Sequence, residues 1–260
     1  MKTEGAVRIV VCGAGGKMGR RIIEIARLSG EFEVVGGVEA KDYKGEPPPC
    51  EIVDDLSRVV ERCQVVIEFT SPEASAMHAK ICGRIGKPMV IGTTGLGSLE
   101  MKEIETAGKS SPIFVSPNMS WGVKILTEAS RMLAAKLGDG YDIEIVEKHH
   151  REKKDSPSGT ALGIAEVICE AKGWSFPDVL KHGREGKVGA RPASELGIHA
   201  VRGGTIVGEH EIIFAGKGER ITVCHKVESR DCFAAGALKA AKFIIGRRPG
   251  RYTMRDMEQA

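Results

Sequence analysis

A short segment starting at His149 concentrates side chains that donate protons and bind anions. It reads His149-His150-Arg151-Glu152-Lys153-Lys154-Asp155-Ser156-Pro157-Ser158-Gly159-Thr160-Ala161. Its cationic residues suit a multiply charged anion, and the 158–160 turn offers backbone N–H groups at an expected helix start. A histidine among cations loses its proton more readily, which favours acid-base chemistry near neutral pH. A solvated charged loop is the alternative that the charge pattern alone leaves open.

Metal chemistry is not expected from this sequence. His149 and His150 have no further Cys, His or acidic residues near them at ligand spacing. The seven cysteines are odd in number, widely scattered and without a C-x-x-C pair, which is typical of reduced thiols.

A glycine-rich loop, Gly13-Ala14-Gly15-Gly16-Lys17-Met18-Gly19, is the second group of residues with a chemical use. It follows an apolar run and opens a helical pattern, so its backbone N–H groups are suited to a pyrophosphate. Met18 breaks the strict G-x-G-x-x-G spacing. Glu39 lies 20 residues after Gly19, where an acid can accept hydrogen bonds from an adenosine ribose. We therefore expect dinucleotide binding rather than a plain glycine-rich turn beside an exposed acid.

Two further loops follow expected strands. Gly92-Thr93-Thr94-Gly95 and Ser116-Pro117-Asn118-Met119 each close an apolar run. Ligands of parallel sheets bind at the carboxyl ends of strands, so a cofactor in this half of the chain makes both loops candidate contacts. Taken alone, each is only a loop.

The elements that position these loops alternate between strand and helix. Strands are expected at 8–12, 32–38, 65–69, 89–91 and 113–115. Helices fit between them: one ends near Gly30, one follows Ser71-Pro72-Glu73 and runs to Ile85, and one starts with Ser98 as its cap. This alternation predicts an α/β fold with a doubly wound parallel sheet.

After Asn118 the pattern changes. A long helix is expected at 123–137, a strand at 142–146 and a helix from about Pro157 to before Gly173. Strand-like pieces follow at 198–202, 205–214 and 220–227, and a final apolar helix at 233–245 is expected to return to the first domain. We predict a Rossmann-type domain comprising residues 1–120 and 233–260, and a second α+β domain comprising residues 121–232.

Composition and charge exclude several classes of function. The 260 residues carry 38 Lys and Arg against 35 Asp and Glu, with no basic block suited to nucleic acid or a membrane surface. No apolar run approaches a membrane span, and the N-terminus shows no signal-peptide pattern. We expect a soluble, cytoplasmic protein.

Together these motifs closely resemble the dihydrodipicolinate reductase family. The resemblance rests on the glycine loop, Glu68-Phe69-Thr70, Gly92–Gly95, the whole His149–Ala161 segment, Arg184-Glu185-Gly186, 201–210 and Arg255-Asp256-Met257. It covers nearly the full chain, and every fixed position of H-H-R-x-K-x-D-x-P-S-G-T-A is filled. It implies NAD(P)H-dependent reduction of 4-hydroxy-tetrahydrodipicolinate to tetrahydrodipicolinate in lysine biosynthesis through diaminopimelate. It also implies a homotetramer assembled through the second domain and an active site in the cleft between the domains.

Carried over position by position, the resemblance implies a role for each candidate residue. His149 is the proton donor or acceptor, and Lys153 supplies a proton and stabilises charge. The substrate-binding positions are His150, Ser158, Gly159 and Thr160, with Ser158 as part of the turn. The cofactor contacts are Gly13, Ala14, Gly15, Gly16, Lys17, Met18, Glu39, Gly92, Thr93, Thr94, Ser116, Pro117, Asn118 and Met119.

Two alternatives and one departure from the family pattern stay open. The alternatives are a related NAD(P)-dependent dehydrogenase of another small carboxylate and a non-catalytic NAD(P)-binding sensor. The intact His149 and Lys153 count against the sensor, and the His149–Ala161 segment counts against the other dehydrogenase. Ala40 stands where many family members carry an arginine for the 2'-phosphate of NADP, so we expect NADH to serve at least as well as NADPH.

Overall fold

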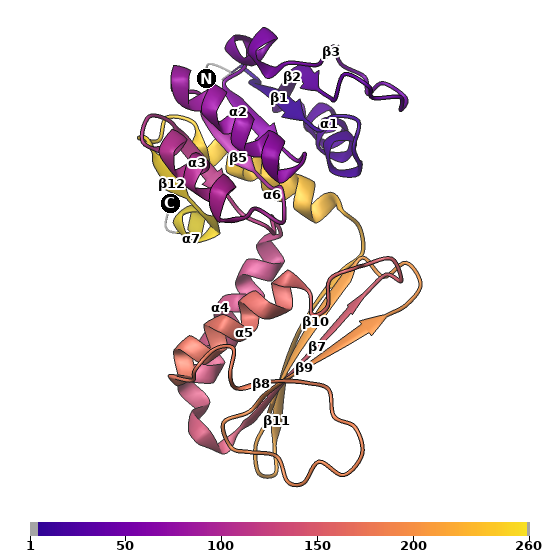
Figure 1. The fold of residues 1–260 in the computed structure, drawn as a ribbon, viewed down its shortest axis with the longest axis vertical. Helices are drawn as coiled ribbons and strands as arrows, with labels where there is room; N and C mark the ends of the chain where they lie inside the picture. The colour runs from indigo at the N-terminus through magenta and orange to yellow at the C-terminus, as the bar shows by residue number, and fades with distance from the viewer. Residues whose placement is uncertain (1–4, 259–260) are drawn as a thin grey trace. The chain divides into compact units, whose positions relative to one another are not determined.

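A computed structural model describes residues 5–258 and divides the chain into two compact units (Figure 1). The first unit contains the chain up to Ser120 and again from Arg230 onward, and the second unit is Trp121–Ser229. Within the described residues, no helix combines the length and the apolar character needed to cross a bilayer.

The first unit is built on a seven-stranded parallel sheet with the strand order β12-β6-β5-β4-β1-β2-β3. The strands are β1 (Val7–Cys12), β2 (Phe32–Val38), β3 (Ile52–Val53), β4 (Val65–Glu68), β5 (Met89–Ile91), β6 (Pro112–Val115) and β12 (Gly250–Tyr252). The chain runs from β1 outward to β2, then returns to the other side of β1 as β4. The strand order therefore reverses between β1 and β4, which is where ligands bind in such sheets.

Helices cover this sheet in two pairs, α1 (Lys17–Ser29) beside α6 (Asp231–Ile244), and α2 (Pro72–Ile85) beside α3 (Ser98–Gly108) (Figure 1). The crossovers through α1 and α2 run in opposite directions along the sheet, so right-handed connections place these helices on opposite faces. Both faces of the sheet are thus buried, which explains the apolar runs Ile9–Cys12 in β1 and Val65–Ile67 in β4. The expected doubly wound parallel sheet is confirmed.

Helix boundaries in the first unit follow capping chemistry. Ser71 caps α2 as expected by accepting a hydrogen bond from the Ala74 amide. The expectation that Ser98 caps α3 is wrong, because the cap is Gly97, whose amide donates to the Glu100 carboxylate at 2.9 Å. A glutamate at the third helical position thus replaces a hydroxyl cap.

The second unit is a five-stranded mixed sheet with two helices. Its strands, in the order β11-β10-β7-β9-β8, are β7 (Asp142–His149), β8 (Leu180–His182), β9 (Leu196–Arg202), β10 (Gly208–Ala215) and β11 (Arg220–Val227). The helices α4 (Trp121–Leu137) and α5 (Gly159–Lys172) pack side by side (Figure 1). They enclose an apolar core with Ile143, Ile145, Ile212 and Phe214 of the sheet. The predicted α+β character of this part of the chain is confirmed.

Strand β7 extends three residues beyond its predicted end, and its side chains alternate between faces. Ile143, Ile145, Glu147 and His149 are all buried and lie on one face. The first two belong to the apolar core, whereas the last two bring a carboxylate and an imidazole to the same face. The central strand of the sheet therefore passes from core into a polar cluster.

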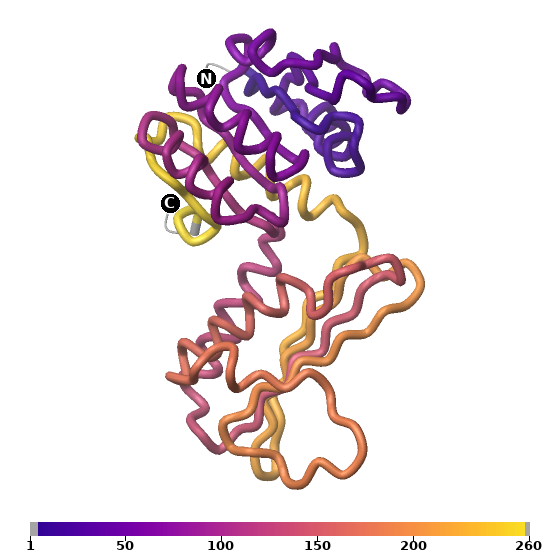
Figure 2. Tube along the Cα trace, viewed as in Figure 1, coloured from indigo at the N-terminus to yellow at the C-terminus, as the bar shows by residue number. Residues whose placement is uncertain are grey.

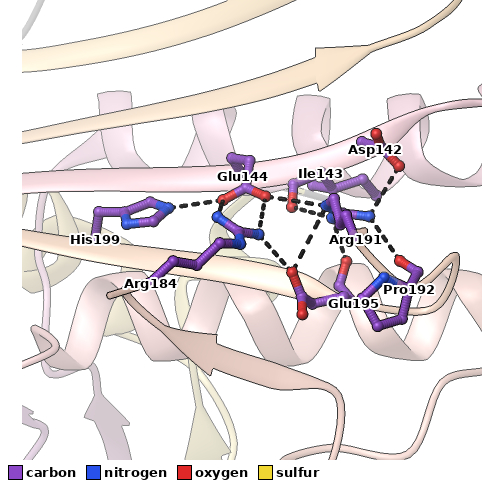
Figure 3. A network of polar contacts seen from close by, with 8 residues as sticks. All are labelled: Asp142, Ile143, Glu144, Arg184, Arg191, Pro192, Glu195 and His199. Atoms are coloured by element: carbon purple, nitrogen blue, oxygen red, sulfur yellow. Dashed lines mark hydrogen bonds and ion pairs between the residues drawn. The ribbon is translucent and has the colours of Figure 1, made fainter. Parts of the chain in front are cut away.

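A network of ion pairs anchors the long connection between β8 and β9 to β7. Figure 2 traces this connection, residues 183–195, as a wide loop. The Glu144 carboxylate accepts hydrogen bonds from Arg184 (2.6 Å), Arg191 (3.1 Å) and His199 (2.7 Å) (Figure 3). Gly197 provides the space, because a Cβ atom there would lie 1.8 Å from the Glu144 carboxylate.

This network makes unfolding sensitive to acid. Burial alone would raise the pKa of Glu144, but the hydrogen bonds from Arg184, His199 and Arg191 outweigh it and lower the pKa to about 2. A lowered carboxylate pKa gives stability that is complete above the unfolded value near 4.3 and is lost as pH falls toward 2. Glu144→Gln should therefore lower the free energy of unfolding at pH 7 by about 1–2 kcal/mol, allowing for solvent screening. Urea melts at pH 2 to 7 check this, since the variant should show a flatter pH dependence below pH 4.5.

Candidate active site and nucleotide loop

The glycine loop after β1 adopts a conformation that needs its glycines. Gly13 has φ +75°, and a Cβ atom there would lie 2.4 Å from the carbonyl oxygen of Phe69. A Cβ atom on Gly19 would lie 2.0 Å from the Gly13 carbonyl oxygen. Among the described side chains none caps the N-terminus of α1 at Gly16. The loop thus presents the N-terminus of a helix at the point where the strand order reverses, which suits a pyrophosphate.

Glu39 lies at the end of β2 and reaches the glycine loop. Its carboxylate accepts a hydrogen bond from the Gly15 amide at 2.6 Å. Arg20 donates to the Gly15 carbonyl at 2.9 Å and to the Tyr43 hydroxyl at 3.0 Å. The Tyr43 ring also packs over Gly15, where a Cβ atom would lie 2.3 Å from the ring. The sequence prediction missed Arg20 and Tyr43, although Arg20 directly follows the last glycine of the loop.

The two other predicted loops lie at the same edge of the sheet. The Gly92 amide donates to the Glu68 carbonyl at 2.9 Å, and the Ser116 amide donates to the Ile91 carbonyl at 3.0 Å. Parallel pairing thus brings the ends of β4, β5 and β6 next to one another. Ala14 and Met119 have buried side chains, so these two residues can present only backbone groups to a ligand.

The remaining predicted cofactor positions differ in exposure. Lys17, Thr94 and Pro117 are exposed, Met18 and Asn118 are half-buried, and Thr93 and Ser116 are buried. Thr93 accepts a hydrogen bond from Ser75 at 2.7 Å, and Ser116 donates to the Asn118 carbonyl at 2.6 Å. The buried members therefore shape the loops rather than present their side chains.

A buried group of potential metal ligands lies beneath this edge. Cys12, Glu68 and His78 place one ligand atom each within 4.8 Å of the others. Glu68 already accepts hydrogen bonds from Thr70 and pairs with His78 Nδ1 at 2.6 Å. The sequence prediction did not find this group, because its members come from β1, β4 and α2. Its hydrogen bonds fix the Glu68-Phe69-Thr70 turn against which Gly13 packs.

His149 occupies the buried end of β7 and is bonded to an acid. Its Nδ1 lies 2.6 Å from Glu147 Oε2. Glu147 is fully buried and also accepts two hydrogen bonds of 2.8 Å from Arg202 and one of 3.0 Å from the Ser158 amide. Burial alone would raise the pKa of Glu147, but these hydrogen bonds lower it. The carboxylate is therefore ionised and paired with both a cation and the imidazole.

The pKa of His149 is set by opposing effects. Burial lowers it, and pairing with Glu147 only partly compensates, while Lys153 and Arg202 lower it further. The net pKa lies below the ordinary histidine value. A lowered pKa favours the neutral imidazole, which is the direction that the sequence analysis expected of a histidine among cations.

Lys153 and Gly159 meet at an internal carboxylate. Lys153 Nζ lies 2.9 Å from Asp155, and the Gly159 amide also donates to that carboxylate. Burial would raise the pKa of Asp155, but the hydrogen bonds from Lys153 and from the Asp155 and Gly159 amides, with the charge of Lys153, together outweigh it and lower the pKa. The positions expected to bind an anion thus already hold one supplied by the chain.

Ser158 caps α5 and contacts a second buried histidine. Its hydroxyl accepts from the Ala161 amide at 3.1 Å and lies 3.0 Å from His210 Nε2. The His210 ring stacks edge-on against His149 at a centroid distance of 5.2 Å, and burial lowers its pKa to about 4. His150 and Thr160 are half-buried in the same segment. His149, Lys153 and the Ser158–Thr160 turn therefore lie in one neighbourhood of the second unit.

Glu147, Arg202 and His210 are the residues of this neighbourhood that the sequence prediction missed. A signal for Glu147 exists, because it continues the period-two alternation of Ile143 and Ile145 toward His149. Arg202 and His210 lie 55 and 52 residues away from the groups they contact, which local spacing does not show.

The fold and this residue set define a two-unit oxidoreductase of the Rossmann type. Family models described as dihydrodipicolinate reductase, N-terminus, and dihydrodipicolinate reductase, C-terminus, match residues 7–119 and 122–257. The chain belongs to the dihydrodipicolinate reductase family.

Individual relatives agree with this membership. The 4-hydroxy-tetrahydrodipicolinate reductase of Caldanaerobacter subterraneus subsp. tengcongensis is 47% identical over 253 residues, covering 96% of this chain and 98% of that protein. The reductase of the same name from Oleidesulfovibrio alaskensis is 44% identical over 257 residues, covering 97% of this chain and 99% of that protein.

Solved structures share the fold. A dipicolinate-bound dihydrodipicolinate reductase from Paenisporosarcina sp. TG-14 matches with a TM-score of 0.77 at 24% identity, covering 95% of this chain and 97% of that one. Aspartate dehydrogenase from Thermotoga maritima matches with a TM-score of 0.51 at 13% identity, covering 93% of this chain and 97% of that one.

Proposed function

We propose that this chain reduces 4-hydroxy-tetrahydrodipicolinate to tetrahydrodipicolinate with NADH or NADPH, in the diaminopimelate route to lysine. Family membership supports the reaction, as does the name that the relatives carry. The observation that carries the proposal in the structure is the buried His149–Glu147 pair beside Lys153 and the 158–160 turn.

Loss of the 4-hydroxyl group as water leaves a conjugated imine in the substrate, and a bound nucleotide would supply the hydride that reduces it. His149 provides the proton that quenches the resulting electron density, and Lys153 offsets the developing negative charge. The amide groups of Ser158–Thr160 and the side chain of His150 hold a substrate carboxylate at the start of α5. When the substrate binds, its carboxylate replaces the Asp155 carboxylate as the acceptor of the hydrogen bonds from Lys153 and the Gly159 amide.

The first unit is the proposed nucleotide-binding domain and the second the proposed substrate-binding domain. The helix N-terminus at Gly16 suits the pyrophosphate, and Glu39 suits the adenosine ribose. The loops at 92–94 and 116–119 lie at the same sheet edge and suit the rest of the cofactor. A homotetramer assembled through the second unit is proposed from the family resemblance, and light scattering on the purified protein tests it.

A coupled assay tests the reaction. Dihydrodipicolinate synthase generates the substrate in place, and oxidation of NADH and of NADPH is followed at 340 nm in parallel. Turnover that depends on the synthase supports the proposal. Nucleotide binding without turnover in a folded protein favours the sensor, and turnover with another small carboxylate alone favours a related dehydrogenase.

We further propose that NADH serves at least as well as NADPH. The Glu39 carboxylate suits a free ribose hydroxyl, whereas a 2'-phosphate there meets a like charge. Ala40 supplies no cation, and Lys41 and Lys44 are exposed lysines that contribute modestly. Arg20 is engaged with Gly15 and Tyr43, so a 2'-phosphate must compete for it.

Ala40→Arg should therefore shift the NADPH-to-NADH ratio of kcat/KM upward by about tenfold, equivalent to about 1.4 kcal/mol. Ala40→Gln is the matched control, since it adds length without charge. A wild type that prefers NADPH by tenfold or more contradicts this interpretation. In that case, loss of the preference in Arg20→Gln assigns the phosphate to Arg20.

A further inference from the structure

The Glu147 carboxylate joins two parts of the candidate site that the sequence keeps separate. Its Oε2 bonds to His149 Nδ1, and its Oε1 accepts the amide of Ser158, eleven residues later. We propose that Glu147 is a positioning residue, which fixes the tautomer of His149 and at the same time fixes the anion-binding turn that begins at Ser158. This inference rests on the proposed function and adds to it a group that touches neither substrate nor cofactor.

The tautomer follows from the hydrogen-bond chemistry. An ionised carboxylate only accepts hydrogen bonds, so His149 must carry a proton on Nδ1. Nε2 is then the nitrogen that gains or loses the catalytic proton. Gly208 leaves space beside it, because a Cβ atom at Gly208 would lie 3.1 Å from Nε2. The arrangement leaves one defined nitrogen for proton transfer.

Arg202 keeps Glu147 in the acceptor state. Its guanidinium donates from both terminal nitrogens, at 2.8 Å to each carboxylate oxygen. It also donates to the Asp155 carbonyl at 2.7 Å, so the same guanidinium holds the loop that carries Lys153 and Asp155. Bidentate pairs of this kind are geometrically specific and stronger than neutral hydrogen bonds.

A purely structural role does not explain the placement of this acid. Glu147 is 0% exposed and occupies a position on the core-facing side of β7, where an apolar residue would continue Ile143 and Ile145 at lower desolvation cost. Four hydrogen bonds converge on its two oxygens, and two of them bind groups assigned to proton transfer and anion binding. The buried carboxylate therefore contacts both the proposed proton-transfer group and the proposed anion-binding turn.

The charged and titratable groups that face His149 come from four places. They are Glu147 on its own strand, Lys153 in the following loop, Arg202 on β9 and His210 on β10. Glu147 is the member that raises the pKa of His149, while Lys153 and Arg202 lower it. Removing the Glu147 charge must therefore lower the pKa of His149 further and weaken the preference for the Nδ1–H tautomer.

The test uses Glu147→Gln, which keeps the size of the side chain and removes its charge. Glu144→Gln is the matched control, because Glu144 lies on the same strand and also pairs with arginines and a histidine, His199. The readouts are the 15N shifts of His149, assigned by the loss of its signal in His149→Gln, and the pH dependence of kcat. We expect Glu147→Gln to shift His149 away from the Nδ1–H tautomer, to move the alkaline limb of kcat to lower pH, and to reduce kcat by about 10- to 100-fold. Glu144→Gln should change neither the tautomer nor the limb.

Unchanged tautomer, limb and kcat in Glu147→Gln, with an active wild type, overturn the inference. An inactive wild type overturns the proposed function instead, whatever the histidine spectra show. Should Glu147→Gln fail to fold, Arg202→Lys replaces it, because lysine keeps the charge and loses the bidentate contact. A shift of His149 away from the Nδ1–H tautomer in this variant then supports the inference, and an unchanged tautomer opposes it.

Discussion

Replacing His149 with glutamine is expected to lower kcat by about 10²-fold or more, and Lys153→Met should do the same. His149 is assigned to proton transfer and Lys153 to stabilising the developing negative charge. Both functions are needed only after hydride transfer begins. Nucleotide affinity should change little, because the glycine loop and Glu39 belong to the other unit of the chain. Steady-state kinetics and nucleotide titration by fluorescence measure the two effects separately.

His150→Ala is the control for this assignment. His150 is assigned to substrate binding, so its loss should raise KM more than it lowers kcat. Near-normal kcat in His149→Gln would refute the assignment of the proton to His149. An equal loss of kcat in His149→Gln, Lys153→Met and His150→Ala would instead indicate that the segment acts only by holding the substrate.

The parallel sheet is the part of the fold that the sequence predicts best. The strands β1 and β4 are short and contain the apolar runs Ile9–Cys12 and Val65–Ile67, which is the pattern of strands buried on both faces. The fold class is confirmed on this basis. The strands β3 and β12 were not predicted, because two or three residues are too few to show a period and their pairing depends on neighbours distant in the sequence.

The candidate site also contains residues that the sequence predicts and residues that it does not. His149, Lys153 and the Ser158 turn fall within one segment, so local spacing is enough to name them, and their roles remain predictions. Arg202 becomes part of the candidate site only because β9 pairs with β7 and places it opposite His149. Likewise, Arg20 reaches Tyr43 only through the fold of the 40–46 loop. Long-range pairing creates these contacts, and no local motif encodes them.

Helical glycines offer the sharpest contrast in expected stability. In α1, a Cβ atom on Gly19 would lie 2.0 Å from the Gly13 carbonyl oxygen and 2.8 Å from the Ala14 Cα, both backbone atoms. A backbone cannot rotate away as a side chain can, so Gly19→Ala must displace the loop or the helix. Overpacking of this kind costs about 1–3 kcal/mol or more, and displacement of the loop should weaken NADH binding by at least about tenfold.

Gly163 in α5 is the matched position, because it is helical and exposed and has nothing within 4 Å of an added Cβ atom. Gly163→Ala should raise the free energy of unfolding by about 0.5–1 kcal/mol, since alanine favours a helix more than glycine does. Urea denaturation and NADH titration of both variants give the comparison. If Gly19→Ala bound NADH normally, the close approach of α1 to the Gly13 carbonyl would not be what shapes the nucleotide loop. Because Gly163 lies in the other unit, its variant also separates a general helix-propensity effect from a specific effect on the loop.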